Sequence, residues 1–104
     1  MKTKILIVGA GVIGSALKST LPPSYYDVQV LDPPKGLHVT DDFEPDAIFV
    51  CVPTPSNPDG TCDASIVLDT VRKYAEHPAH VVVRSTVPPS VVEDLIRIRY
   101  DVII

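Results

Sequence analysis

Several short runs of the chain are apolar at nearly every position, which is the pattern of strands buried on both faces of a sheet. The clearest runs cover residues 5–8, 47–52 and 81–83, and more mixed or shorter ones cover residues 27–31, 37–39 and 102–104. Strands that are apolar on both faces are typical of parallel sheets with helices on either side. The pattern therefore predicts five complete strands, with residues 102–104 opening a sixth.

Between these runs, apolar residues recur at the spacing of amphipathic helices. A first helix is expected over residues 12–21, ended by the double proline that follows. Asp63 is expected to cap a second helix, and Ser90 with Glu93 forms the capping box of a third. The side chains expected to face the core are Ile13, Ala16, Leu17 and Leu21 in the first helix, Val67, Leu68, Val71, Tyr74 and Ala75 in the second, and Val92, Leu95 and Ile96 in the third.

The junction between the first strand and the first helix carries the pattern G-x-G-x-x-G, formed by Gly9, Gly11 and Gly14 with Val12 and Ile13 between them. Gly9 allows a tight turn, Gly11 lets the main chain approach a pyrophosphate, and Gly14 lets the helix pack closely on the sheet. The helix N-terminus adds free amide groups and a partial positive charge, which attract an anion. Together with the alternating strands and helices, the motif predicts a shortened, Rossmann-like, doubly wound α/β domain over residues 1–104, with strand order 3-2-1-4-5-6.

Asp32 ends the second predicted strand, at the spacing at which an acidic residue binds the adenosine ribose of a dinucleotide. Its carboxylate repels the extra phosphate of NADP, and Lys35 is the one nearby cation that opposes this repulsion. NAD is therefore the expected cofactor. Three alternatives stay open: glycines that only shape a tight junction, a flavin site, and an S-adenosylmethionine site.

Two further motifs follow the ends of predicted strands, at the edge where open α/β sheets bind ligands. The first is Val52-Pro53-Thr54-Pro55, continued by Asp59-Gly60-Thr61-Cys62-Asp63-Ala64-Ser65, and the second is Arg84-Ser85-Thr86-Val87-Pro88-Pro89. Thr54 and Thr86 place hydroxyl groups toward the nicotinamide end of a bound dinucleotide. Each hydroxyl also has a purely structural alternative, a hydrogen bond to neighbouring main chain. For Thr54 the two interpretations are balanced, and for Thr86 the functional one is favoured only by the family resemblance described next.

In this order, the three motifs resemble the UDP-glucose/GDP-mannose dehydrogenase family, whose NAD-binding domains carry C-V-P-T-P, D-G-x-x-D-x-S and S-T-V-P-P. The resemblance implies oxidation of the C6 alcohol of a nucleotide sugar to a carboxylate, with two NAD reduced. It adds Val52 and Pro53 to the cofactor contacts and places Thr86 beside the reacting carbon. It also implies a catalytic cysteine in a later domain, which neither Cys51 nor Cys62 matches.

Two departures from the family pattern affect this interpretation. Residues 36–46 replace a segment that is a few dozen residues longer in the family, which removes part of the adenine side and weakens the assignment of Lys35 as a cofactor contact. Ser90 stands where glycine is common. Because the catalytic-cysteine region is absent, we expect no complete reaction from this chain alone. The alternative function is a non-catalytic NAD-binding or interaction module derived from the family.

Composition and charge exclude several other classes of function. A net charge of −4 with scattered Lys and Arg argues against nucleic-acid binding, and no apolar run is long enough to span a membrane. A cytoplasmic location with reduced cysteines is expected. No metal site is expected, because His77 and His80 lack a third ligand and residues 41–46 suit a solvated acidic loop. The expected partners are NAD and a nucleotide sugar, with a homodimer across the last strand or association with a catalytic chain as further expectations.

Overall fold

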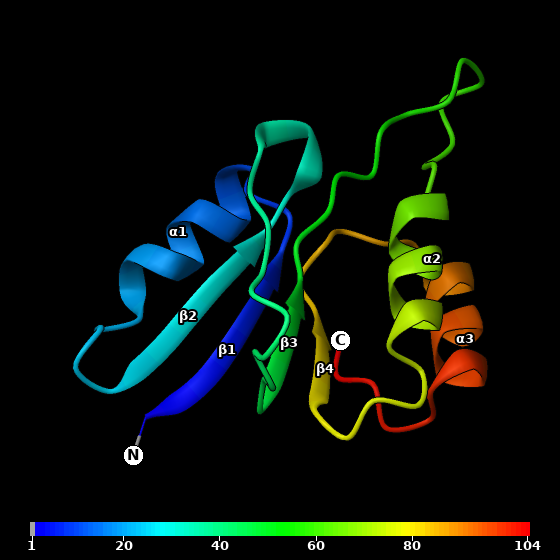
Figure 1. Ribbon diagram of the computed structural model, residues 1–104. Coiled ribbons are helices and arrows are strands. Elements are labelled where there is room, and N and C mark those ends of the chain that lie inside the picture. Colours follow the sequence, from blue (N-terminus) through cyan, green and yellow to red (C-terminus); the bar gives the residue numbers. More distant parts are fainter. Residues whose placement is uncertain (1) are drawn as a thin grey trace.

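A computed structural model describes residues 2–104 and contains a four-stranded, entirely parallel sheet in the order β2-β1-β3-β4 (Figure 1). The strands are β1 (Thr3–Val8), β2 (Tyr26–Leu31), β3 (Ala47–Val50) and β4 (His80–Val83), and the helices are α1 (Val12–Thr20), α2 (Ser65–Lys73) and α3 (Pro89–Ile98), with a short 3-10 turn η1 (Pro33–Lys35) after β2. This is the predicted Rossmann-like fold class. The four strands correspond to positions 2-1-4-5 of the expected order.

The expected outer strands do not form as strands. Leu37 makes one antiparallel bridge to Asp32, and Ile103 makes one parallel bridge to Val82. The segment after Leu37 crosses the sheet face instead of adding to its edge, because Val39 and Phe43 pack against the core there. The predictions of a strand at residues 37–39 and of a strand opening at residues 102–104 were therefore wrong beyond these single bridges.

A side chain of β2 holds this crossing segment in place. The amide group of Gln29 accepts a hydrogen bond from the Thr40 main-chain N–H (2.9 Å) and donates one to the Thr40 hydroxyl (3.0 Å). The segment thereby takes the place of a covering helix while leaving β2 at the edge of the sheet.

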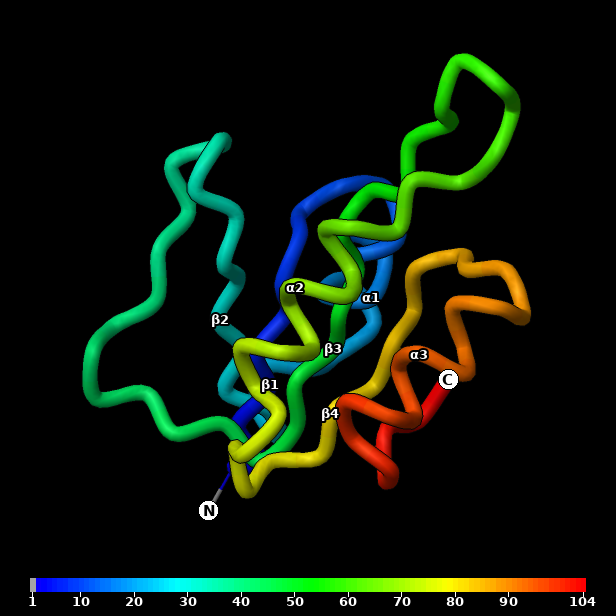
Figure 2. The backbone as a smooth tube through the Cα atoms, turned by 90° about the vertical axis from the view of Figure 1, so that its right-hand side faces the viewer, coloured from blue at the N-terminus to red at the C-terminus, as the bar shows by residue number. Residues whose placement is uncertain are grey.

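The two faces of the sheet are covered by different helices. Alternate residues of β1 and β3, including Leu6, Val8 and Ile48, pack against α2 and α3. Ile5 and Ile7 pack on the opposite face with Leu17 of α1 and with Leu21, the C-cap of that helix. The helices therefore stand on both sides of the sheet, as the doubly wound arrangement requires (Figures 1 and 2).

The buried stripe of α1 differs from the predicted one. Ile13 is 43% exposed and Ala16 is also exposed, whereas Gly14 is buried beside Leu17. A side chain at position 14 would overlap the carbonyl oxygen of Gly9, so the helix lies against the sheet at this glycine. That contact turns Ile13 away from the core.

The predictions for the other two helices held in part. In α2, Val67 and Val71 are fully buried. The N-cap is Ala64 and not Asp63 as predicted, although the Asp63 carboxylate, one residue before the cap, accepts a hydrogen bond from the Ser65 N–H (3.0 Å). The capping box of α3 was wrong. This helix already starts at Pro89, which puts Ser90 inside the first turn, where α3 has no side-chain cap.

The earlier start of α3 also changes which of its side chains face the core. Leu95 is fully buried and Val91 and Ile98 pack against the core, but Ile96 is 46% exposed. The prediction that Ile96 faces inward was therefore wrong.

A buried arginine ties the elements together at the end of the sheet opposite the glycine motif. Arg99 is 8% exposed and donates hydrogen bonds to the carbonyl oxygens of Tyr74 (2.9 Å) and Ala79 (2.7 Å) and to the Asp101 carboxylate (2.8 Å). It thus links the end of α2, the entry to β4 and the end of α3. Among residues 2–104, no buried side-chain nitrogen or oxygen lacks a hydrogen-bond partner.

Candidate cofactor pocket

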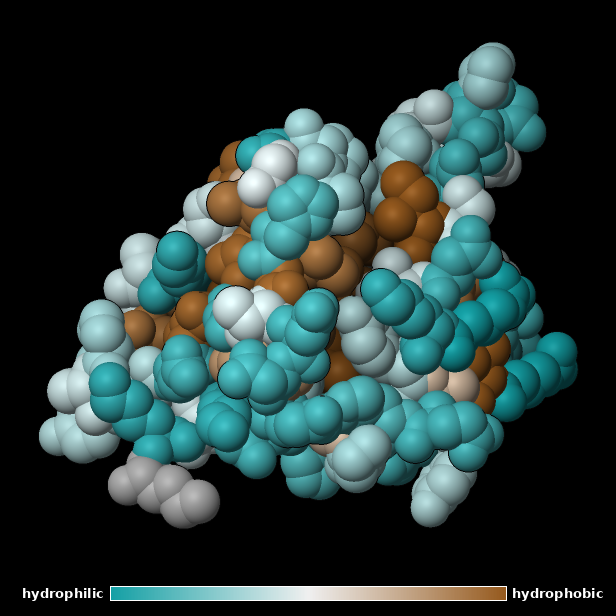
Figure 3. Space-filling model, viewed as in Figure 1, coloured by the Kyte–Doolittle hydropathy of each residue, from teal (hydrophilic) through white to brown (hydrophobic). Residues whose placement is uncertain are grey.

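The loops that follow all four strands meet at one edge of the sheet and enclose a pocket of about 720 Å³. Its size is within the range of small-molecule sites. Figure 3 shows apolar side chains exposed in the hollow between the loop above β2 and the start of α2. The predicted site residues that line the pocket are Gly9, Gly11, Val12, Ile13, Asp32, Lys35, Val52, Pro53, Thr54 and Thr86.

The three glycines of the motif occupy three different environments. Gly9 has a φ of +100°, and a Cβ there would lie 2.6 Å from the carbonyl oxygen of Cys51. Gly14 lies under the loop and outside the pocket lining. A Cβ at Gly11 would meet nothing within 4 Å, so the chain passes this residue with open space beside it.

That open space lies at the N-terminus of α1. Gly11 is the N-cap, no side chain caps the helix, and its first turn holds no acidic residue. The first amide groups of the helix therefore face the pocket without a side-chain acceptor, which favours an anion.

Two charged side chains hold the residue between the first two glycines. Asp32 accepts a hydrogen bond at Oδ2 from the Ala10 N–H (2.8 Å), and the Lys35 ammonium donates one to the Ala10 carbonyl oxygen (2.8 Å). The second carboxylate oxygen of Asp32 has no hydrogen bond to any residue within 2–104. This oxygen is an available acceptor at the mouth of the pocket.

The other side of the pocket is built by the loops after β3 and β4. Val52 is buried and Thr54 is half-buried, whereas Pro53 and Thr86 are exposed. The hydroxyl that bonds to main chain in this region is that of Ser85, which donates to the Val52 carbonyl oxygen (2.8 Å). Ser85 thereby fixes one loop against the other beneath Thr86.

Beyond Thr54 the chain forms a projecting hairpin. Ser56 and Cys62 make an antiparallel bridge, and the Asp59 carboxylate accepts hydrogen bonds from the main-chain N–H and the hydroxyl of Thr61. Both bonds lower the pKa of Asp59. The hairpin stands away from the body of the domain before α2 begins (Figures 1 and 2).

Sequence reasoning missed nine residues that line the pocket. Five lie at the ends of β1 and β2 or directly after them, namely Val8, Ala10, Leu31, Pro33 and Pro34, and the other four are Cys51, Ser85, Ile66 and Thr70. Ile66 and Thr70 lie one turn apart at the start of α2, and their spacing on the helix was the one signal available. Cys51 is 7% exposed, and its burial raises the pKa of the thiol, an effect that the positive charge of Arg84 only partly opposes. A thiol held in its neutral form is a poor nucleophile.

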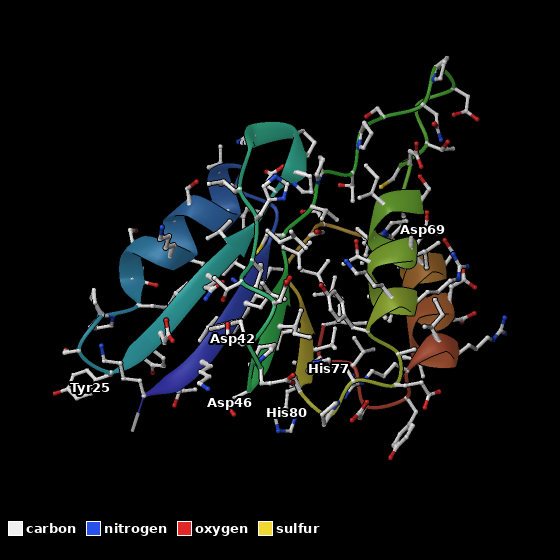
Figure 4. The ribbon with its side chains drawn as sticks, in the orientation of Figure 1. Tyr25, Asp42, Asp46, Asp69, His77 and His80 are labelled. Atoms are coloured by element: carbon white, nitrogen blue, oxygen red, sulfur yellow. The ribbon has the colours of Figure 1, made fainter. Side chains whose placement is uncertain are left out.

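The histidines and acidic residues considered for a metal do not join the pocket. Figure 4 shows His77, His80 and Asp46 near the end of the sheet opposite the pocket. His77 accepts the Ala79 N–H at Nδ1 (3.0 Å), and Asp46 accepts the Lys4 N–H (2.8 Å). In the part of the chain that the structure describes, no three His, Cys, Asp or Glu side chains are grouped to hold a metal ion, and no helix has the length and hydrophobicity to cross a membrane.

The sequence matches a family model over residues 35–101, which is more than half of the chain. The model is that of the UDP-glucose/GDP-mannose dehydrogenase family, NAD binding domain. The chain belongs to this family. The glycine motif and Asp32 precede the matched range, so their assignment to a cofactor site depends on the pocket geometry.

Solved structures of the UDP-glucose/GDP-mannose dehydrogenase family share the fold. A ternary complex of GDP-mannose dehydrogenase from Pseudomonas aeruginosa matches with a TM-score of 0.70 and 22% identity over 94% of this chain. A UDP-glucose dehydrogenase from the hyperthermophilic archaeon Pyrobaculum islandicum matches with a TM-score of 0.68 and 20% identity over 99% of this chain. The chain spans 33% and 34% of the lengths of these two proteins. A search of curated proteins gave no match.

Proposed function

We propose that residues 1–104 form an NAD-binding domain that serves a nucleotide-sugar dehydrogenase. The observation that carries this proposal is the pocket at the carboxyl edge of the sheet, where an uncapped helix N-terminus, open space at Gly11 and an available oxygen of Asp32 meet. These are the groups that a dinucleotide needs for its pyrophosphate and its adenosine ribose. Membership of a family whose matching domain binds NAD supports the choice of cofactor.

Each group in the pocket has a proposed part in binding. The amides beside Gly11, Val12 and Ile13 hold the pyrophosphate, and the second oxygen of Asp32 accepts a hydrogen bond from the ribose. Lys35 supplies a positive charge on the adenosine side.

The nicotinamide end is proposed to lie along the loops after β3 and β4. Val52, Pro53 and Thr54 form one wall there, and Thr86 offers its hydroxyl from the other. Thr86 is the one residue of this chain that we place close to the reacting carbon. When bound, NAD supplies a hydride acceptor, and the residues of this chain orient it.

The proposed reaction is the oxidation of a nucleotide-sugar C6 alcohol to a carboxylate. Cys51 does not suit the covalent step of this chemistry, because burial raises its pKa and keeps the thiol protonated. We therefore assign a catalytic cysteine and most of the sugar-binding groups to a part of the enzyme outside these 104 residues, in the same or an associated chain.

Calorimetric titration with NAD, NADH and NADP tests the cofactor assignment. We expect NAD or NADH to bind with a Kd between about 1 µM and 1 mM, in preference to NADP. Asp32→Ala should weaken NAD roughly tenfold, since it removes a hydrogen bond to a charged acceptor, and should narrow its advantage over NADP. Asp42→Ala makes the same change of charge outside the pocket and should leave both affinities unchanged.

Two results would contradict the proposal. If the folded chain binds none of the three dinucleotides, the pocket is not a cofactor site and the interaction-module alternative gains support. If Asp32→Ala binds NAD as tightly as the unaltered chain, the ribose contact is wrong.

A further inference from the structure

The face of the sheet on which α1 lies is only half covered. Of the helices in residues 2–104, α1 alone packs on this face, against the cluster that contains Ile5 and Ile7 of β1. The other two helices, α2 and α3, pack on the opposite face. Figure 1 shows α1 beside β1 and β2, on the side of the sheet away from α2 and α3. On the face that they share with α1, β3 and β4 therefore have no covering helix within these residues.

The side chains left uncovered form one row across the strands. The register places Phe49 between Ile7 and Val82, and a parallel bridge to Val82 adds Ile103 at the end of the row. Ile103 faces this side because its neighbour Val102 packs against the cluster on the other face. Ile7 is fully buried, Phe49 and Val82 are half-buried, and Ile103 is 50% exposed. In the part of the chain that the structure describes, Val82 and Ile103 pack against neither buried cluster.

This uncovered strip has the dimensions of one short helix. Neighbouring strands lie about 4.8 Å apart, so the strip from β3 across β4 to Ile103 is about 10 Å wide. A helix with its side chains is about 10 Å across, and the axes of packed helices lie about 8–10 Å apart. Strands of four residues are about 13 Å long, which is the length of about nine helical residues. One helix beside α1 would therefore cover the strip.

An exposed cation stands at the carboxyl end of the strip. Arg84 follows Val82 in the alternation of β4, so its side chain belongs to the same face. Its positive charge acts on the thiol of Cys51, which is part of the cluster under α1. None of the ion pairs within residues 2–104 includes Arg84. The C-terminal end of a helix carries a partial negative charge and is the end that this arginine favours.

We infer that the strip formed by Phe49, Val82 and Ile103 binds one amphipathic helix from the part of the dehydrogenase that lies outside these 104 residues. The helix has an apolar stripe, runs antiparallel to α1 and ends beside Arg84. The inference rests on the proposed function, which assigns the catalytic cysteine to that outside part. This chain spans only 33% and 34% of the lengths of the two solved relatives, so their remaining parts are large enough to supply such a helix.

A second copy of this chain fits the strip less well. Each partner in a stable dimer buries roughly 800 Å². Three partly exposed side chains offer far less than that area. A helix that belongs to the same enzyme needs no such area, because the rest of the enzyme already holds it close to the strip.

The test is a titration of the whole chain with a stapled helical peptide, followed by NMR of isotope-labelled isoleucine and valine methyl groups. The peptide has about 14 residues, with leucines along one stripe and glutamates in its last turn, and the staple is needed because a free helix of this length is marginal in water. We expect the methyl signals of Val82 and Ile103 to shift and saturate. Ile103→Lys should weaken binding at least about tenfold, because it places a charge in the apolar row.

Ile96→Lys is the matched control. Ile96 is 46% exposed, close to the value for Ile103, but it belongs to α3, which packs on the opposite face. This variant makes the same change of size and charge and should bind the peptide as the unaltered chain does. Arg84→Glu tests the direction of the helix. It should favour a peptide with lysines in its last turn about threefold over one with glutamates, the reverse of the preference of the unaltered chain.

Several results would overturn this inference. If the methyl signals of Val82 and Ile103 do not shift, the strip binds no helix, and if both lysine variants weaken binding equally, the peptide responds to net charge. Tighter binding of an extended peptide with alternating leucines would assign the site to the outer edge of β4. A dimer in sedimentation that Ile103→Lys dissociates would show that a second copy covers the strip.

The cofactor site is tested separately. Val82 and Ile103 do not line the cofactor pocket, so Ile103→Lys should bind NAD as the unaltered chain does. A chain that binds NAD but not the peptide refutes only the helix site. A chain that binds the peptide but no dinucleotide refutes only the cofactor site.

Discussion

Adding one methyl group should affect two glycines of the motif in different ways. At Gly14 it should lower the stability of the fold, and at Gly11 it should weaken cofactor binding without affecting stability. A Cβ at Gly14 would overlap the carbonyl oxygen of Gly9 and lie 3.4 Å from the side chain of Ile7. The obstacle is main chain, so relief requires α1 to move away from β1. A Cβ at Gly11 meets nothing within 4 Å and the residue has a φ of −75°, which suits any amino acid.

The magnitudes differ accordingly. Overpacking of this kind costs about 1–3 kcal/mol or more, and the better helix propensity of alanine returns at most about 1 kcal/mol, so Gly14→Ala should destabilise the domain by roughly 2 kcal/mol. For a domain of this size that is a fall in Tm of about 8–16 °C. At Gly11, alanine is a poorer N-cap than glycine by up to about 1 kcal/mol, but it restricts the unfolded chain by a similar amount. Gly11→Ala should therefore stay within about 0.5 kcal/mol of the unaltered chain.

Urea unfolding followed by circular dichroism measures the first effect, and calorimetric titration with NAD measures the second. Gly11→Ala should fold normally yet bind NAD at least about tenfold more weakly, because its methyl group fills the space that the pyrophosphate needs. Ala16→Gly, at an exposed position of the same helix, calibrates the propensity term. A Gly14→Ala variant as stable as the unaltered chain would refute the close approach of α1 to β1. A Gly11→Ala variant with normal NAD affinity would refute the pyrophosphate assignment.

Three further predictions concern the buried arginine and the cysteines. Arg99→Met should lower the free energy of unfolding by about 2–4 kcal/mol, measured by urea denaturation, because the buried Ala79 carbonyl loses its side-chain donor and the Tyr74 carbonyl keeps only the His77 N–H. The hydrogen bond from Arg99 lowers the pKa of Asp101, so the stability that this carboxylate adds at neutral pH should be lost as the pH falls below the usual range of aspartate. In Asp101→Asn that part of the acid-induced loss should be absent when unfolding curves at pH 7 and pH 3 are compared. Iodoacetamide should modify Cys51 at least about tenfold more slowly than Cys62 in mass-spectrometric time courses, and urea should remove the difference.

The parts of the fold that the sequence predicted are those in which neighbouring residues carry the signal. The apolar runs at residues 5–8 and 81–83 lie within β1 and β4, and the glycine motif connects a strand to a helix as expected. Because strands buried on both faces are apolar at nearly every position, the run can be recognised as a strand even if its predicted bounds are off by one residue. The position of Asp63 at the start of α2 was also predictable to within one residue, because its hydrogen bond joins it to Ser65, only two positions ahead.

One wrong prediction has a local cause, and another depends on residues far apart in the chain. Ser90 and Glu93 fit a capping box, but the N-cap of α3 is Pro88, two residues earlier, because proline favours the first turn of a helix and Pro89 starts it. Residues 37–39 have the composition of a strand, yet hydrogen bonds from Gln29 and the packing of Phe43 draw the following segment across the sheet. Neither tertiary contact leaves a local pattern that periodicity detects.

The misplaced side chains of α1 nevertheless agree with the glycine motif. If Gly14 is the residue that touches the sheet, Ile13 has to turn toward the carboxyl edge, so the motif itself contradicted the apolar stripe that periodicity suggested. Val12, Ile13 and Ile66 are 88%, 43% and 42% exposed, and all three line the pocket. Exposed apolar side chains gathered in one hollow are costly unless a ligand covers them. The exposure of these three apolar side chains in the pocket therefore supports a binding site at this edge of the sheet, independently of the glycines.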